Sequence, residues 1–408
     1  MELKERKLFK CIKEHLNNKE CSIIIGARQT GKSTILRQLQ LYLEKENKKV
    51  ISITLEDPLI LNELNKHPEN IFKFVKKPVD AKKIYVLVDE IQYLNAPTNF
   101  LKLLFDKYSD ALKIVATGSS AFYMDNKFKD SLSGRKKIFE LYTLDFEEYL
   151  DFKNADHEMV EELRFIRNDN NYISLKRKEI NNYFDDYLSF GGYPAVVLKD
   201  NELEKTDTLK ELFLSYLKKD ALEAGIQYHD KFYNLLVIIA HQSGSLLNIN
   251  ELSNTLGMSV TAVSNYIYVL RKSFHIQLVP PFFNNIRKEL TKMPKIYFND
   301  LGLRNIIMNY FNPIMQRADK GTVIENYIYI RLRQLYGHEN IRFWRTTSGA
   351  EIDFIYNSGK IKSGIEAKFN ANEFKPSKYT KFTESYPDIS INCKAYLSKN
   401  NEKNIIGL

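Results

Sequence analysis

The sequence predicts an α/β protein that begins with a doubly wound parallel sheet, continues through helical segments and ends in a smaller α/β domain. Apolar strand-like runs alternate with helix-like runs over residues 20–120. This alternation is typical of a parallel sheet covered by helices. Three of the runs end in polar or acidic residues, and open α/β sheets bind their ligands at the carboxyl ends of the strands.

The most informative run has the form Gly, four residues, Gly-Lys-Ser, between a strand-like stretch (22–25) and a helix-like stretch (34–43). Such a loop turns its backbone N–H groups toward an anion. In this context we predict a phosphate-binding loop for ATP, in which Lys32 contacts the β- and γ-phosphates and Ser33 ligates Mg²⁺. The predicted nucleotide-binding residues are Gly26, Ala27, Arg28, Gln29, Thr30, Gly31, Lys32, Ser33 and Thr34.

A second strand-like run, residues 84–88, is apolar throughout and is followed by Asp89 and Glu90. An unbroken apolar run is typical of a strand buried on both faces. We predict that Asp89 holds Mg²⁺ and that Glu90 orients or deprotonates an attacking water. The alternative is a strand that ends in a solvated acidic turn.

A third run, residues 113–117, ends in Thr117 and is followed by Gly118 and Ser119. Small hydroxyl side chains at a strand end can hydrogen-bond the attacking water or the γ-phosphate. We therefore predict a polar sensor role for Thr117 or Ser119. An ordinary exit from a strand into a turn is the alternative.

Composition and charge limit the classes of protein. The chain has 408 residues, which suggests two to four domains, and three cysteines whose wide spacing indicates reduced thiols and no zinc site. No apolar run is long enough to span a bilayer, so we expect a cytoplasmic protein that does not contact the membrane. Residues 286–408 contain 20 Lys and Arg against 12 Asp and Glu and supply most of the net charge of +9. This excess favours a polyanionic partner such as DNA, although it also fits a surface that only aids solubility.

Motif positions divide the chain into four predicted domains: an ATPase core (1–144), a helical lid (145–230), a winged-helix-like module (231–285) and a C-terminal domain (286–408). The third domain is predicted from the order helix, helix, glycine turn, helix, strand. Its third helix begins with residues 259–266, which contain no Lys or Arg. We therefore favour an interdomain or protein contact over the reading of DNA by this helix.

The C-terminal domain contains a second candidate site. Residues 341–345, 351–355 and 365–369 are strand-like, and Asp353 and Glu366 lie on two of these strands. Glu366 and Lys368 alternate in period two and so point to one face. An Asp…Glu-X-Lys arrangement is typical of restriction-type nucleases, in which the carboxylates bind Mg²⁺ and the lysine polarises water. Glu325, in a helical run, could complete the metal site; a hairpin with solvent-facing charges is the alternative.

Taken together, the chain resembles prokaryotic AAA+-type P-loop ATPases with a C-terminal restriction-endonuclease-like domain. The matching motifs lie along nearly the whole chain: residues 26–33, 88–92, 117–120, 132–135, 146–149, 191–194, 297–303, 325–326, 343–345 and 351–354. The resemblance implies ATP binding and hydrolysis, and it makes Arg135 a candidate phosphate-sensing or finger arginine. The alternative is an ordinary arginine at the end of a helix. AAA-type ATPases often assemble so that an arginine reaches a neighbour's phosphate, so the resemblance also makes a homo-oligomer plausible.

Two functions remain open at this point. One is an ATPase that drives or gates action on nucleic acid by a nuclease-like site with Asp353, Glu366 and Lys368 as catalytic residues. The other is a nucleotide-switched module that binds protein or DNA, in which the nuclease-like domain is catalytically inactive.

Overall fold

The computed structural model describes residues 3–75, 83–118, 132–168, 172, 174–223, 225–283, 289, 292–346, 348–359, 361–397 and 404–407. The chain folds into two compact units. The first contains Met1–Tyr142 and Lys272–Phe274, and the second contains Thr143–Arg271 and His275–Leu408. Within the described ranges, none of the helices is long and apolar enough to cross a bilayer.

The first unit is built on a five-stranded sheet with the order β2-β3-β4-β1-β5, in which every pair of neighbours is parallel. The α/β class predicted from the sequence is confirmed. The elements are α1 (Lys7–His15), β1 (Cys21–Ile25), α2 (Lys32–Lys45), β2 (Lys49–Thr54), α3 (Pro58–Lys66), β3 (Ile84–Asp89), α4 (Pro97–Tyr108), β4 (Leu112–Gly118) and β5 (Lys136–Glu140).

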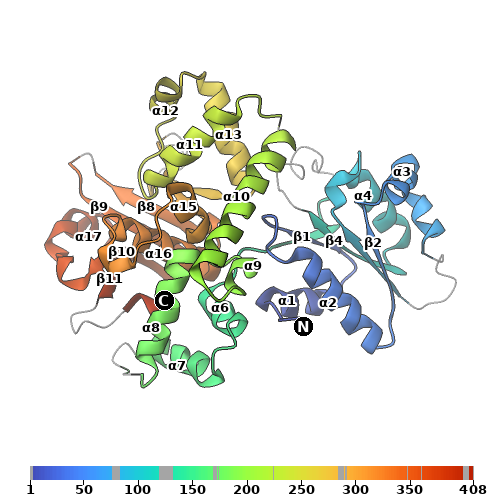
Figure 1. Ribbon diagram of the computed structural model, residues 1–408, viewed down its shortest axis with the longest axis horizontal. Helices are drawn as coiled ribbons and strands as arrows, with labels where there is room; N and C mark the ends of the chain where they lie inside the picture. Colours follow the sequence, from blue (N-terminus) through green and yellow to red (C-terminus); the bar gives the residue numbers. More distant parts are fainter. Residues whose placement is uncertain are drawn as a thin grey trace. The chain divides into compact units, whose positions relative to one another are not determined.

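Side chains alternate between two cores, one on each face of this sheet. Ile23 and Ile25 point into the core that contains Leu64 of α3 and Leu101 of α4. Ile24 points into the other core, which contains residues of α1 and α2. This period of two explains why the strands are apolar throughout. Figure 1 shows α1 and α2 on one side of the sheet and α3 and α4 on the other.

The second unit begins with helices and ends with an α/β part. Its helices are α6 (Phe146–Phe152), α7 (His157–Asn168), α8 (Arg177–Phe190), α9 (Pro194–Val197), α10 (Glu202–Glu223), α11 (His229–His241), α12 (Ile249–Leu256), α13 (Val260–Lys272), α15 (Leu301–Met308), α16 (Lys320–Tyr336) and α17 (Thr380–Ser385). Its strands are β6 (Ile276–Val279), β7 (Lys295–Phe298), β8 (Ile341–Arg345), β9 (Glu351–Ser358), β10 (Ile361–Asn370) and β11 (Ser390–Leu397).

Helices from the predicted lid share one hydrophobic core with the C-terminal sheet. This core includes Leu150 of α6, Leu163 of α7 and Phe184 of α8, together with Tyr327 of α16 and Phe354 of β9. Phe184 and Tyr327 pack edge to face, with ring centroids 4.8 Å apart. The predicted segments 145–230, 231–285 and 286–408 therefore fall almost entirely within one compact unit.

The order predicted for residues 231–285 is present as α11, α12, α13 and β6. The Asn248 side chain accepts a hydrogen bond from the Glu251 N–H and caps α12. Gly257 ends α12 with a φ of 57°, a left-handed conformation that favours glycine. β6 then pairs with β7 in an antiparallel hairpin. The order of helices, turn and strand in this segment is that of a winged helix-turn-helix. The second strand of the hairpin, β7, belongs to the C-terminal domain.

Two glycine-containing motifs of the second unit, residues 191–194 and 297–303, pack closely against each other. A Cβ on Gly191 or Gly302 would overlap backbone or side-chain atoms of the opposite motif, at Asp300 and Phe190 respectively. The buried Asp300 side chain accepts hydrogen bonds from the N–H groups of Gly192 and Leu303, and so caps α15. These motifs are thus explained by close packing between α8 and α15.

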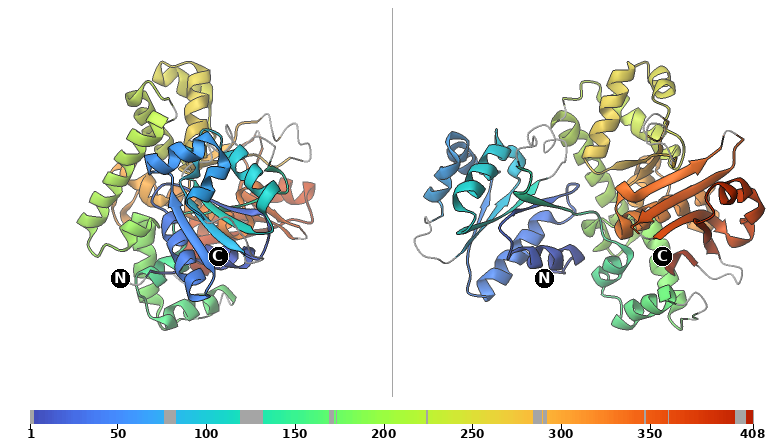
Figure 2. Two further views of the ribbon diagram at one scale, coloured as in Figure 1. Left: turned by 90° about the vertical axis from the view of Figure 1, so that its right-hand side faces the viewer. Right: turned by 180° about the vertical axis from the view of Figure 1, so that it is seen from behind.

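The C-terminal sheet has the order β11-β10-β9-β8 and is shown from behind in Figure 2. β8 and β10 are antiparallel to β9, and β11 is parallel to β10. The three strand-like runs predicted from the sequence correspond to β8, β9 and β10. Asp353 and Glu366 therefore lie on neighbouring strands.

Candidate functional site

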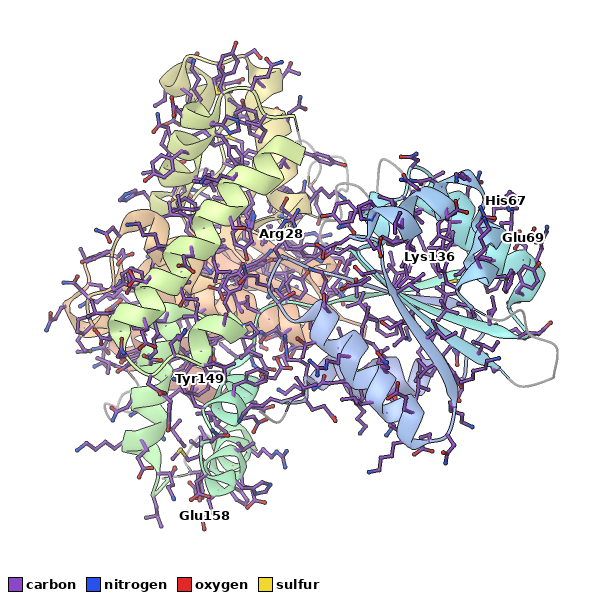
Figure 3. All side chains as sticks on the ribbon, turned by 45° about the vertical axis from the view of Figure 1, so that its right-hand side comes forward. Arg28, His67, Glu69, Lys136, Tyr149 and Glu158 are labelled. Atoms are coloured by element: carbon purple, nitrogen blue, oxygen red, sulfur yellow. The ribbon has the colours of Figure 1, made fainter. Side chains whose placement is uncertain are left out.

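The phosphate loop connects β1 to α2 in a conformation that its glycines permit. Gly31 has a φ of 99°, and a Cβ on Gly26 would overlap the carbonyl of Leu141. The buried Lys32 ammonium donates to the carbonyl oxygens of Gly26 (3.0 Å) and Ala27 (2.9 Å). It therefore lies inside the curl of the loop, where a phosphate oxygen could replace these neutral acceptors and form stronger, charge-assisted bonds. Arg28, labelled in Figure 3, belongs to the same loop.

An arginine near the N-terminus supports this loop from outside it. The Arg6 side chain is buried, and its Nη1 donates to the carbonyl of Thr30 at 2.7 Å. Its Nη2 donates to the carbonyl of Tyr142 at 2.8 Å, at the end of the first unit. One rigid guanidinium thus joins the phosphate loop to the segment that follows β5.

The acidic pair at the end of β3 is held by a threonine from the neighbouring strand. The Thr117 hydroxyl donates to Asp89 Oδ1 and accepts from the Glu90 N–H at 3.0 Å. Glu90 has a φ of 58°, which is uncommon for a residue with a side chain and is often found at functional positions. The Gln92 amide donates to Glu90 Oε2.

Strand order explains why these residues lie at one site. β4 lies between β1 and β3, so Thr117 at its end comes between the phosphate loop and the acidic pair. Thr117 pairs in register with Ile24, one residue before the last residue of β1. The structure therefore brings Lys32, Asp89, Glu90 and Thr117 to the same edge of the sheet. Ser119 lies outside the described residues.

Arg135 is not at this edge. β5 is parallel to β1, and Lys136 pairs with Cys21, the first residue of β1, whereas the phosphate loop follows the last. The five residues of β1 separate the two edges by about 16 Å. Arg135 Nε instead donates to Asp106 Oδ1 at 2.6 Å. Arg135 therefore lies at the edge of the sheet opposite the phosphate loop, and its role as a phosphate-sensing or finger arginine stays a prediction.

Figure 3 makes the same separation visible, because it labels Arg28 in the loop and Lys136 at the start of β5. In the sequence, Arg135 falls within the predicted ATPase core, just before the last strand of the sheet. Only the register of β5 shows which end of the sheet it occupies.

The carboxylates predicted in the C-terminal domain gather around a buried lysine, Lys295, the first residue of β7. Its ammonium lies 2.9 Å from Glu325 Oε1, 2.6 Å from Glu351 Oε1 and 3.4 Å from Asp353 Oδ1. The Tyr297 hydroxyl also donates to Glu325 Oε1, at 2.6 Å. We call Lys295, Glu325, Glu351 and Asp353 the carboxylate cluster.

Glu366 and Lys368 lie beside this cluster. Lys368 Nζ is 2.5 Å from Glu366 Oε1, so the two side chains share one face of β10, as their spacing predicts. The N–H of Ala367, between them, donates to Asp353 Oδ2 at 2.9 Å. The structure thus brings together Asp353, Glu366 and Lys368, the three residues predicted for nuclease chemistry.

Burial and crowding shift the pKa values of these groups. Burial raises the pKa of Glu325 to about 7; the charge of Asp353 adds to this rise, and Lys295 opposes it. Burial also raises the pKa of Glu366, with a further contribution from Asp353. For Lys295, burial lowers the pKa, but the surrounding carboxylates outweigh burial and raise it above its ordinary value. Lys295 therefore stays charged.

The predicted metal site of Glu325, Asp353 and Glu366 is not formed in the expected way. Among the described residues, no three His, Cys, Asp or Glu side chains are arranged to hold a metal ion. The ammonium of Lys295 lies among the carboxylates instead. These residues, as arranged, do not fit a divalent cation.

Sequence reasoning missed Arg6, Lys295, Glu351 and Gln92. Lys295 is a charged residue that opens the apolar run 296–298, and this position could have marked it as a buried cation. Glu351 lies two residues before Asp353, so the period of a strand places both on one face. Arg6 carries no comparable local signal, because both of its partners are far along the chain.

Family models match three parts of the chain. Residues 18–150 match the model described as an AAA domain. Residues 181–313 match a domain of unknown function (DUF8612), and residues 320–406 match another domain of unknown function (DUF4143). The AAA match covers the whole sheet of the first unit.

Relatives along most of the chain include an uncharacterized protein of Haemophilus influenzae, 26% identical over 391 residues, which covers 92% of this chain and 89% of the relative. An uncharacterized protein of Methanocaldococcus jannaschii is 25% identical over 367 residues, covering 86% of this chain and 75% of the relative.

Among solved structures, AMPPCP-bound DnaA from Aquifex aeolicus is 17% identical, with a TM-score of 0.30 over 66% of this chain and 88% of that one. PCH-2 of C. elegans is 14% identical, with a TM-score of 0.31 over 64% of this chain and 65% of that one. Scores this low carry no inference about function. Residues 18–150 thus have the nucleotide-binding P-loop fold of an AAA domain, in a chain whose relatives named above are uncharacterized.

Proposed function

We propose that the first unit binds ATP with Mg²⁺ and hydrolyses it. The observation that carries this proposal is the link from Thr117 to both Asp89 and Glu90, at the edge of the sheet that bears the phosphate loop. A site for binding alone has no need of a carboxylate fixed beside the one that holds the metal. A hydrolytic site needs both.

The residues fit the metal as well as the nucleotide. Ser33 is exposed in the first turn of α2, and Asp89 is half-buried at the end of β3. A hydroxyl and a carboxylate are oxygen donors of the kind that Mg²⁺ takes beside substrate phosphates. The ion, when bound, would neutralise negative charge on the phosphates. Ser33 and Asp89 would hold it, and Lys32 would exchange its carbonyl partners for phosphate oxygens.

Glu90 would accept the proton of the attacking water or orient that water. Its left-handed backbone turns it away from the direction of β3, and the bond from Gln92 restrains its carboxylate. Thr117 donates to the Asp89 carboxylate and accepts from the Glu90 backbone N–H, so it fixes the Asp89 side chain relative to the backbone that carries Glu90. Under this proposal the two adjacent carboxylates have different tasks: Asp89 holds the metal and Glu90 acts on the water.

The variant Glu90→Gln tests this assignment, because it keeps the size and the contact with Gln92 but removes the base. We expect ATP turnover to fall by about 10²- to 10⁴-fold while ATP binding is retained. Glu56→Gln is the matched control, since Glu56 is an exposed acid just after the neighbouring strand β2. Turnover in Glu90→Gln equal to that of the control would contradict the proposal.

We propose further that nucleotide turnover controls binding of nucleic acid, DNA in the first place, by the second unit. The excess of positive charge in residues 286–408 supports this step. DNA affinity measured with ATP, ADP and no nucleotide, over a range of salt concentrations, tests it. Equal affinities in the three states would contradict coupling, and a salt-independent affinity would favour a protein partner instead.

Cleavage of nucleic acid is the second candidate function. The convergence of Asp353, Glu366 and Lys368 favours it. The position of Lys295 disfavours it, because such a site would need a divalent cation among the same oxygens. Incubation of DNA with the wild type and with Asp353→Ala, in Mg²⁺ or Mn²⁺, distinguishes the two functions.

A further inference from the structure

We infer that Lys295 is a fixed internal cation that takes the place of a metal ion in the carboxylate cluster, so that this cluster holds no divalent ion. This inference does not depend on ATP hydrolysis by the first unit. It rests on how Lys295 is held, on how the carboxylate oxygens are used and on the size of the cluster.

The backbone around Lys295 is fixed on both sides. The N–H of Leu247 donates to the carbonyl of Pro294 at 2.8 Å, and the N–H of Ile296 donates to Ser245 at 3.1 Å. Lys295 itself pairs with Val279 in the β6–β7 hairpin. With its side chain only 2% exposed, it is not a flexible surface lysine that happens to turn inward.

Helix α16, which carries Glu325, is fixed to β7, the strand that carries Lys295. The Asn326 side chain accepts from the N–H of Phe298 at 2.8 Å and donates to the carbonyl of Phe298 at 2.9 Å. A Cβ on Gly244 would lie 3.1 Å from Glu325 Oε2, so Glu325 also packs tightly against the preceding loop. The Glu325–Asn326 pair therefore sets the distance between α16 and Lys295.

Several carboxylate oxygens around Lys295 already accept hydrogen bonds. Glu325 Oε1 accepts from both Lys295 and Tyr297. The Asp353 carboxylate accepts from Lys295 through one oxygen and from the N–H of Ala367 through the other. Glu351 also lies 3.5 Å from Arg345 through its second oxygen. A divalent ion would have to break several of these bonds and would meet the charge of Lys295.

The dimensions of the cluster suit an ammonium ion. The nitrogen of Lys295 lies 2.6 to 3.4 Å from its three carboxylate oxygens. Mg²⁺ binds oxygen at about 2.1 Å in near-octahedral geometry, so a divalent ion could bind here only if the ammonium were removed and the carboxylates closed in around the ion. The lone ammonium provides charge without coordination, so the cluster would not activate water as a metal does.

Binding of Mn²⁺ to the full chain, measured without nucleotide, tests the inference. Bound Mn²⁺ is measured as the decrease of the electron paramagnetic resonance signal of the free ion. We expect the wild type and Asp353→Asn to bind the same amount of Mn²⁺. Lys295→Met empties the position of the cation, and we expect it to bind one additional Mn²⁺ per chain. The double variant Lys295→Met, Asp353→Asn should lose that additional ion. Lys292→Met, at an exposed lysine three residues earlier, should behave as the wild type.

The inference is overturned if the wild type binds a Mn²⁺ ion that Asp353→Asn abolishes. It is also overturned if folded Lys295→Met binds no additional ion, because the ammonium then does not occupy a cation position. Should Lys295→Met fail to fold, the comparison of the wild type with Asp353→Asn decides by itself. Fluorescence of Trp344, the single tryptophan of the chain, reports folding of the second unit.

Discussion

Lys32 in the first unit and Lys295 in the second are both buried lysines at candidate sites, but their ammonium groups meet different partners. Lys32 is 5% exposed and donates to two neutral carbonyls of its own loop. Lys295 is 2% exposed and lies among three carboxylates from two other elements. The partners of Lys32 can be replaced by a ligand, whereas those of Lys295 are part of the fold.

The difference shows that the partners of a buried lysine indicate whether it belongs to a ligand site or to a structural centre. A buried ion is stable when fixed opposite charges surround it, and removal of one partner then leaves the others uncompensated. A lysine that contacts backbone carbonyls in a glycine-rich loop can give them up to an anion at low cost. The same residue type therefore indicates a ligand site in one unit and a structural centre in the other.

The largest effect should come from removing each ammonium in turn. Lys295→Met leaves buried carboxylates without their central cation, and we expect the free energy of unfolding of the second unit to fall by about 3–5 kcal/mol. Lys32→Met removes bonds to neutral carbonyls, one of which also accepts from Thr30, so we expect a loss of about 1 kcal/mol in the first unit.

Urea denaturation followed by Trp344 fluorescence measures the first value, because Trp344 lies in β8 of the second unit. Hydrogen exchange of β1 and β4 measures the second. The distinction between the two lysines fails if Lys32→Met costs as much stability as Lys295→Met. Lys292→Met serves as the exposed control for the loss of a positive charge.

Ligand affinity should show the reverse order. We expect Lys32→Met to weaken ATP binding about 100-fold, which corresponds to about 2.7 kcal/mol of charge-assisted contact with phosphate. Lys295→Met should leave ATP affinity unchanged as long as the first unit is folded. Fluorescent ATP titration measures both. An equal loss in both variants would mean that the two sites are not separate in function.

Short local patterns predicted much of this molecule. The phosphate loop, the strand that leads to Asp89 and the alternation of Glu366 with Lys368 depend on neighbours within a few residues. Periodicity and spacing report such relations directly. The helices α12 and α13 were predicted for the same reason, since a cap, a glycine turn and apolar spacing mark their ends.

The features that the sequence did not predict depend on strand pairing and on contacts between residues far apart along the chain. The position of Arg135 follows from β5 pairing with β1 and not from its distance along the chain. Lys295 contacts carboxylates 30 and 58 residues away, and Arg6 contacts carbonyls 24 and 136 residues away. No local pattern encodes those pairs, so the cluster was predicted with its acids but without the cation at its centre.

A smaller effect, on ATP turnover, is expected when the Thr117 hydroxyl is removed. Thr117→Val keeps the shape of the side chain but removes the hydroxyl that joins Asp89 to the Glu90 N–H. We expect turnover to fall about tenfold, in line with about 1.4 kcal/mol for lost hydrogen bonds, with little change in ATP affinity. Steady-state kinetics and nucleotide titration separate the two quantities. A loss of affinity without a loss of turnover would mean that Thr117 only shapes the loop.

The smallest effect is expected at Arg6, which donates to backbone carbonyls of Thr30 and Tyr142. Arg6→Lys keeps the charge, but a single ammonium cannot reach Thr30 and Tyr142 with the geometry of a guanidinium. We expect the KM for ATP to rise about fivefold, equivalent to about 1 kcal/mol, while kcat changes less than twofold. Arg37→Lys, at an exposed position of α2, is the control. If KM stays at the control value, the phosphate loop keeps its conformation without Arg6, and its glycines and Lys32 suffice. If kcat falls instead, Arg6 also affects the acidic pair, and the loop and that pair are structurally coupled.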